Sequence, residues 1–134
     1  MAVQNTLTIE TPGRGIYDIT ARIDDVVRQH DLKAGLCHVF CQHTSCSLIL
    51  CENYDNDVKA DIETYLSGVV VDGDGRFQHT IEGKDDMSAH IRTMLTQSEL
   101  TLPISSHQLA LGQWQGIIYM SIVMRLIRET WLSR

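Results

Sequence analysis

The pattern of apolar and polar residues predicts strands along most of the chain. Short stretches that alternate between the two types, or that are continuously apolar, are separated by turn residues such as those at 12–15 and 105–107. This is the pattern of strands joined by tight connections. A short connection also predicts that the third and fourth strands lie side by side as a hairpin. The expected strands cover 6–11, 16–19, 36–44, 46–51, 100–104, 108–111 and 115–124.

Three other segments place apolar residues three and four positions apart, which is the spacing of one helix face. Helices are therefore expected over 20–30, over 57–67 with Asp55 or Asn56 as the N-cap, and from Asp85 or its neighbour onwards. Together these elements predict an α+β fold with mostly antiparallel sheets and about three helices. The apolar stripes of the three helices are Ile19, Ile23, Val26 and Val27, then Val58, Ile62, Tyr65 and Leu66, then Met87, Ile91, Met94 and Leu95.

The composition is that of one ordinary globular domain. The chain has 134 residues, of which 43% are hydrophobic and 21% are charged, so a single domain over 1–134 is expected. Its longest apolar run, 117–124, is far shorter than the ~18 residues of a membrane span. The first residues lack the basic and apolar regions of a signal peptide. These features predict a cytoplasmic protein with no membrane partner.

The net charge of −6 is concentrated in the middle of the chain. Residues 52–91 hold three basic and ten acidic side chains, an arrangement that repels nucleic-acid phosphate and attracts cations. Because the rest of the sequence contains no basic stripe, we expect no nucleic-acid partner. A solvated acidic surface also explains this charge, so the charge by itself does not establish a cation site.

The four cysteines, Cys37, Cys41, Cys46 and Cys51, lie among apolar residues. No pair has the two-residue separation of a structural zinc site, and a disulfide framework is typical of secreted chains. We therefore expect buried cysteines that act as small hydrophobic residues. The alternative is a nucleophile activated by a base, since Cys41 lies two residues before His43.

A first group of candidate functional residues flanks the fourth predicted strand. His43, followed by Thr44 and Ser45, ends the preceding strand, and Glu52 ends the fourth strand itself. A histidine and a carboxylate near one rim of a sheet can bind a metal or transfer a proton. An ordinary surface histidine explains the same residues, so this group needs support from elsewhere in the chain.

A denser group of candidate ligands lies in the segment 79–90. Asp86 and His90 are four residues apart and share one face of the predicted helix, while His79 and Glu82 lie in the loop that enters it. Two imidazoles with neighbouring carboxylates form a ligand set that Zn²⁺ accepts, and the carboxylates also suit Mg²⁺. The alternative is structural, because an aspartate stabilises a helix start and His90 can be a core histidine.

A third candidate segment contains a tryptophan and a glutamine between two glycines. Gly112 and Gly116 permit a close backbone approach or a bulge around Trp114 and Gln115. Trp114 can then form a pocket wall, and Gln115 can bind a ligand through hydrogen bonds. A buried tryptophan packed at a turn is the alternative interpretation.

These segments together resemble the YjbQ-like family, whose members are described as secondary thiamine-phosphate synthases. The family pattern HTS-x-x-L-x-x-x-E-N-x-D is matched at 43–55, H-x-x-EG-x-DD-x-x-x-H at 79–90, and LG-x-WQG-I at 111–117. The resemblance implies an α+β fold with β-sandwich character and assembly as a homotrimer. After Tyr119 the chain departs from the family pattern, because the glutamate expected near Ser121 is absent.

The resemblance also implies a polar site for a metal or an anion near the subunit interfaces. The implied metal ligands are His43, His79 and His90, with Glu82 and Asp86 as the catalytic carboxylates. The implied cofactor is a divalent metal, either zinc or magnesium. Four further residues are implied as contacts to the substrate or to the ligands: Thr44, Ser45, Asn53 and Gln115.

The implied reaction is a metal-assisted transfer that joins a pyrimidine-methyl pyrophosphate to a thiazole phosphate and releases pyrophosphate. A cation is needed to neutralise that leaving group, and few basic side chains lie near the second group: Arg76, Lys84 and Arg92. Two other functions stay open. One is a non-catalytic trimeric protein that binds a metal or a small molecule, and the other is a metal-dependent hydrolase with Glu82 as its base.

Overall fold

The computed structural model describes residues 3–123 in full and the backbone of 127–133. The predicted α+β class is confirmed, and none of the helices in these ranges is long and apolar enough to cross a lipid bilayer. In chain order the elements are β1 (Asn5–Thr11), β2 (Gly15–Asp18), α1 (Thr20–Gln29), β3 (Ala34–Phe40), β4 (Cys46–Glu52), α2 (Asn56–Val69), α3 (Asp86–Leu95), β5 (Glu99–Ser105), β6 (Gln108–Leu109), β7 (Gln115–Ser121) and β8 (Ile127–Ser133).

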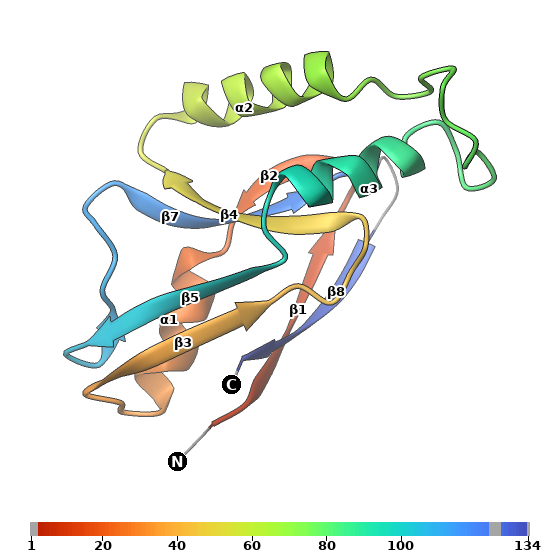
Figure 1. Cartoon of the computed structure of the whole chain (residues 1–134). Helices are drawn as coiled ribbons and strands as arrows, with labels where there is room; N and C mark the ends of the chain where they lie inside the picture. Colours follow the sequence, from red (N-terminus) through yellow and green to blue (C-terminus); the bar gives the residue numbers. More distant parts are fainter. Residues whose placement is uncertain (1–2, 124–126, 134) are drawn as a thin grey trace.

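The described strands form two antiparallel sheets (Figure 1). The larger sheet has the strand order β1-β8-β3-β5-β6, and the smaller sheet has the order β2-β7-β4. In Figure 1 the smaller sheet lies above the larger one, and α2 lies above the smaller sheet. Helix α3 packs against β4, while α1 packs against β6 and β7. Strand β8, which the sequence pattern did not predict, pairs with β1 and also contacts β3.

The predicted hairpin between the third and fourth strands is wrong. Strand β3 pairs with β5 and β8 in the larger sheet, whereas β4 pairs with β7 in the smaller sheet. The connecting segment 41–45 has five residues and none of them has a positive φ, so it does not form a two-residue hairpin turn, which needs such residues. Ser106 and His107 have positive φ, at 53° and 66°, and they form the predicted tight turn between β5 and β6. Segment 41–45 instead carries the chain from one sheet to the other.

The apolar core joins the two sheets. Leu48 and Ile117 of the smaller sheet and Val39 and Leu102 of the larger sheet are at most 2% exposed. These side chains belong to one buried cluster, which also contains Ile23 of α1. The alternating burial along β5 follows the period of two expected for a strand with one solvated face. The sheets are therefore held together by apolar burial rather than by shared strands.

The cysteines are packing residues, as predicted. Cys37, Cys41 and Cys46 are buried in the core cluster, Cys51 is half-buried, and none of the four is in a disulfide. Burial raises the pKa of the Cys37 and Cys51 thiols, which lowers their reactivity at neutral pH.

The predicted apolar stripe of α3 is wrong, because this helix buries a polar face. Met94 and Leu95 are 81% and 55% exposed, whereas Asp86 and Arg92 are each 1% exposed. Buried charges need partners, and the surrounding elements supply them. Arg92, for example, donates from Nη1 to Oε1 of Glu63 on α2 at 2.9 Å. Polar partners in the tertiary structure thus decide which face of α3 turns inward.

Candidate metal centre

Two histidines and an aspartate meet at the N-terminal end of α3. Asp86 is the first residue of this helix, and His90 follows one turn later on the same face, as the spacing predicts. His79 reaches them from the connection 70–85 between α2 and α3. The positive end of the helix dipole stabilises a negative charge at the position of Asp86.

Both imidazoles face one oxygen of the aspartate. The Nε2 atoms of His79 and His90 lie 2.9 Å and 3.1 Å from Oδ2 of Asp86. One ligand atom from each of the three residues lies within 4.8 Å of the others. The carboxylate is almost fully buried, whereas the side chains of His79 and His90 are 44% and 29% exposed. The group therefore opens to solvent on its imidazole side.

The other ring nitrogen of His90 is held by the segment between the two sheets. Its Nδ1 lies 2.9 Å from the carbonyl oxygen of Thr44 and 3.4 Å from Oγ of Ser45. Because a carbonyl only accepts hydrogen bonds, Nδ1 carries a proton. Nε2 of His90 then faces Oδ2 of Asp86 at 3.1 Å, so either a shared proton or a metal ion lies between these two atoms.

Among the described residues, the structure does not bring His43 or Glu82 into this three-residue group. His43 is half-buried, and its Nδ1 accepts a hydrogen bond from the backbone N–H of Ser45 at 2.9 Å. Glu82 lies exposed in the turn between His79 and Asp86. Their assignments as metal ligand and catalytic carboxylate stay predictions.

Asn53 and Gln115 lie at the opposite end of β4 from Thr44 and Ser45. Strand β4 pairs with β7 along its seven residues, and Gln115 begins β7 opposite Glu52. At the rise of a β-strand, the two ends of β4 are roughly 20 Å apart. The four residues predicted as substrate contacts thus form two separate pairs within one chain.

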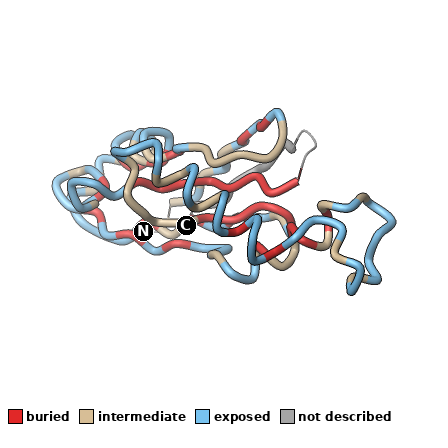
Figure 2. Tube along the Cα trace, turned by 90° about the horizontal axis from the view of Figure 1, so that it is seen from above, coloured by how far each residue is buried: buried red, intermediate tan, exposed pale blue. Residues whose placement is uncertain are grey.

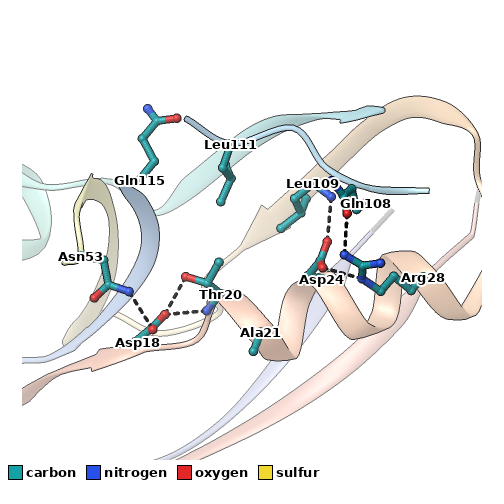
Figure 3. Close-up of a pocket in the computed structure, with 10 residues that line it drawn as sticks. All are labelled: Asp18, Thr20, Ala21, Asp24, Arg28, Asn53, Gln108, Leu109, Leu111 and Gln115. Carbon is teal, nitrogen blue, oxygen red and sulfur yellow. Dashed lines mark hydrogen bonds and ion pairs between the residues drawn. The ribbon is translucent and has the colours of Figure 1, made fainter. Parts of the chain in front are cut away.

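Asn53 and Gln115 line a hollow of about 420 Å³ beside α1 (Figure 3). Its walls come from α1, from the start of β7 and from the residues around β6. Sequence reasoning missed this hollow, because its residues come from segments far apart in the chain and form no local motif. The remaining lining residues are Asp18, Thr20, Ala21, Asp24, Arg28, Gln108, Leu109 and Leu111.

The protein's own hydrogen bonds engage the carboxylates of this hollow. Asp18 accepts from Nδ2 of Asn53 at 2.7 Å and from the backbone N–H and the hydroxyl of Thr20 at 2.9 Å and 2.6 Å. Burial alone would raise the pKa of Asp18, but these hydrogen bonds outweigh it and lower the pKa overall. Asp24 accepts from the backbone N–H of Leu109 and from Nε of Arg28, both at 2.7 Å. Through these hydrogen bonds the two carboxylates connect the segments that form the walls of the hollow (Figure 3).

The segment around Trp114 positions Asn53 by a close backbone approach. A Cβ atom on Gly116 would lie 2.5 Å from Cβ of Asn53, and the backbone N–H of Asn53 donates to the carbonyl of Trp114 at 2.8 Å. Trp114 itself is 50% exposed and packs edge-on against Tyr54. The interpretation of Trp114 as a buried residue is therefore wrong.

The substitution Gly116→Ala is expected to lower the free energy of unfolding by about 1–3 kcal/mol, because the new methyl group overpacks a site with no room for it. Urea denaturation measures this change. Gly35→Ala, also in a strand, is the matched control, since no described atom beyond its chain neighbours lies within 4 Å of a Cβ there. Equal losses in the two variants would show that the approach of Asn53 is not the cause.

Two of the three basic side chains predicted near the cluster are already paired. Arg92 is buried against Glu63. Arg76 binds Asp74 at 2.5 Å and, through hydrogen bonds, lowers the pKa of that carboxyl to about 2. Lys84 is exposed, two residues before Asp86 in the chain. The structure therefore offers few cationic groups to a phosphorylated ligand.

Known proteins similar to this chain match it over most of its length. A family model described as UPF0047 protein YjbQ-like matches residues 5–133. UPF0047 protein sll1880 of Synechocystis is 42% identical over 114 residues, which cover 85% of this chain and 78% of that protein. UPF0047 protein YjbQ of Escherichia coli O157:H7 is 37% identical over 118 residues, covering 87% and 85%. The crystal structure of an uncharacterised YjbQ/UPF0047 protein from Clostridium acetobutylicum has a TM-score of 0.84 at 28% identity and covers 98% of both chains. This chain therefore belongs to the UPF0047 YjbQ-like family.

Proposed function

We propose that the chain is a metal-dependent enzyme whose ion is bound by His79, Asp86 and His90. The single observation that carries the proposal is the convergence of both Nε2 atoms on one buried oxygen of Asp86. A buried carboxylate needs a compensating positive charge, and a divalent cation in contact with all three ligand atoms would supply it.

The donor set favours zinc over magnesium. Two imidazole nitrogens and one carboxylate oxygen suit Zn²⁺, whereas Mg²⁺ prefers oxygen ligands in an octahedral arrangement. The carbonyl of Thr44 would orient His90, as outer partners of metal-bound histidines do. Three protein ligands with an exposed side are typical of catalytic zinc sites, which keep one position open. We propose His43, in the neighbouring segment, as an additional ligand.

The reaction that we propose joins a pyrimidine-methyl pyrophosphate to a thiazole phosphate, and it rests on the family resemblance. A bound divalent ion would neutralise the charge of the pyrophosphate leaving group. We assign Glu82 to stabilise the positive charge that develops on the pyrimidine methylene carbon as the pyrophosphate departs. Thr44 and Ser45 contact His90 of the cluster and are proposed as substrate contacts.

We propose that Asn53 and Gln115 contact the substrate from a neighbouring subunit. They lie too far from the histidines of their own chain for one small substrate to touch both. In the homotrimer that the resemblance implies, a neighbouring chain would place its Asn53 and Gln115 near the cluster. A particle mass three times that of the chain would support this part of the proposal.

The proposal is tested by the metal content of untagged protein, wild type beside His90→Ala. We expect about one zinc ion per chain in the wild type and its loss in the variant, because His90 supplies one of three ligands. Formation of thiamine phosphate above the His90→Ala background, with Zn²⁺, Mg²⁺ or Mn²⁺ added, tests the reaction. Bound metal without formation of thiamine phosphate would contradict the transferase activity and support the metal site. Absence of metal from both proteins would contradict the metal site itself.

A second function, binding of a metal or small molecule without turnover, is favoured by one observation. Arg76 and Arg92 are both paired with carboxylates of the chain, which leaves little positive charge for a substrate with several phosphate groups. Thermal stabilisation by a ligand, with no product, distinguishes this function from the transferase.

A further inference from the structure

One ligand of the proposed metal site lies in a long exposed connection. The chain between α2 and α3 projects from the body of the molecule and is mostly exposed (Figure 2). His79 lies in this connection, whereas Asp86 and His90 lie on the first turns of α3. Holding a loop residue in one place costs conformational entropy, so the position of His79 depends on how the connection is anchored.

The start of the connection is anchored by Asp72. Arg14, in the turn between β1 and β2, binds both oxygens of Asp72, with Nη1 to Oδ2 at 2.7 Å and Nη2 to Oδ1 at 3.0 Å. The same arginine donates from Nε to the carbonyl of Ile122 at 2.7 Å, just beyond β7. A bidentate pair of this kind fixes the direction of both partners. Asp72 is thereby tied to the body of the protein.

Asp72 also binds the helix that carries the other two ligands. The hydroxyl of Ser88 donates to Oδ1 of Asp72. Ser88 is fully buried and lies between Asp86 and His90 on α3. The contact therefore joins the start of the connection to the first turns of α3, on which the cluster is built.

A backbone contact closes the connection next to this anchor. The N–H of Gly73 donates to the carbonyl of Lys84 at 2.8 Å. This hydrogen bond joins the start of the connection to its end, and His79 lies in the loop between them. Gly73 has φ of 68°, a conformation that glycine adopts without strain. The stretch carrying His79 is thus a closed loop whose base is held by Asp72.

We propose that Asp72 is a positioning residue for the metal site. It holds the start of the loop that carries His79 by binding Ser88 of α3 and Arg14 of the turn between β1 and β2. The proposal rests on the function proposed above, since it concerns the geometry of that same site. Burial by itself would raise the pKa of Asp72, but the hydrogen bonds from Arg14 and Ser88 and the charges of Arg14 and Arg92 lower it overall. The anchor is therefore ionised at neutral pH.

The test measures Zn²⁺ affinity of the full chain by competition with a chelator, for wild type, Asp72→Ala, Ser88→Ala and the double variant. Partners that orient metal ligands are worth 10–100-fold in affinity, so we expect Asp72→Ala to bind Zn²⁺ about tenfold more weakly. The double variant is expected to bind no more weakly than Asp72→Ala, because Asp72→Ala already removes the Asp72–Ser88 contact that Ser88→Ala removes. Asp74→Ala is the matched control, since Asp74 lies in the same loop and pairs with the exposed Arg76. We expect its affinity to match that of the wild type.

The outcomes separate this inference from the function on which it rests. A lower melting temperature of Asp72→Ala with unchanged Zn²⁺ affinity would show a purely structural role and overturn the inference. Equal weakening by Asp74→Ala would overturn it as well. If the wild type binds no Zn²⁺, the proposed function fails, and the imidazole NMR signals of the metal-free protein decide the inference instead. A change of the His79 signals in Asp72→Ala, but not in Asp74→Ala, supports it, and unchanged signals contradict it.

Discussion

Asp86→Asn is expected to lower the affinity for Zn²⁺ by more than about 100-fold, because loss of an outer partner already costs 10–100-fold and Asp86 is proposed as a direct ligand. Its Oδ2 is the atom toward which both imidazoles converge, at 2.9 Å and 3.1 Å. The asparagine keeps the size of the side chain but removes the negative charge that the cation needs. Titration with Zn²⁺ in competition with a chelator measures the effect.

Asp85→Asn is the matched control for this change. It removes the same charge from the adjacent residue, whose carboxylate is not part of the three-residue group. We expect Asp85→Asn to bind Zn²⁺ within a few-fold of the wild type. Equal losses in the two variants would mean that the acidity of the segment, rather than the ligand geometry, attracts the metal. Thermal unfolding of both variants without metal shows whether each is folded.

Leu48→Ala is expected to lower the free energy of unfolding by about 3 kcal/mol, because it opens a cavity in the core between the two sheets. Leu48 is 0% exposed, and its backbone exchanges two hydrogen bonds with Gln97. Neighbouring side chains fixed in two sheets have little freedom to fill the space. Urea denaturation, with the slope compared between the proteins, measures the loss.

Leu36→Ala provides the control for Leu48→Ala. Leu36 lies on β3 but is 68% exposed, so removal of its side chain leaves no cavity. We expect a change within about 0.5 kcal/mol. A loss at Leu36 as large as that at Leu48 would contradict the assignment of the core to the space between the sheets.

The sequence predicted those elements whose residues interact with near neighbours in the chain. The helix at 20–30 was predicted from its apolar spacing, and Ile23 and Val27 are indeed buried. Asp55 caps α2 through a hydrogen bond from the backbone N–H of Asp57, as its position before the helix predicted. The tight turn at 105–107 was also predicted. Local backbone preferences and helical periodicity are sufficient for these features.

The sequence failed where distant partners determine the outcome. The apolar stripe predicted for α3 is exposed at Met94 and Leu95. The opposite face is buried instead, because polar groups such as Glu63 bind its side chains. The predicted pairing of β3 with β4 was wrong for a related reason. Strand β7 lies far along the chain and offers β4 a partner along its full length.

In the candidate site, too, local spacing predicted some features, whereas contacts between distant residues determined others. The spacing of Asp86 and His90 placed both on one helix face, and the clustering of His79 with them predicted a cation site. The roles of Thr44 and Ser45 depend on a contact across some 45 positions of the chain, with His90. Their predicted companions Asn53 and Gln115 lie instead at the other end of β4, in the hollow beside α1.

The sequence by itself determined the fold class, most helix and strand positions, the family and the segment 79–90 in which the cluster lies, because local spacing and ordered motifs carry that information. Only the tertiary structure decided which strands pair, which face of α3 is buried, and which predicted site residues meet. It also revealed the anchor formed by Arg14, Asp72 and Ser88. These features depend on hydrogen bonds and burial between residues far apart in the chain, and no local pattern records such contacts.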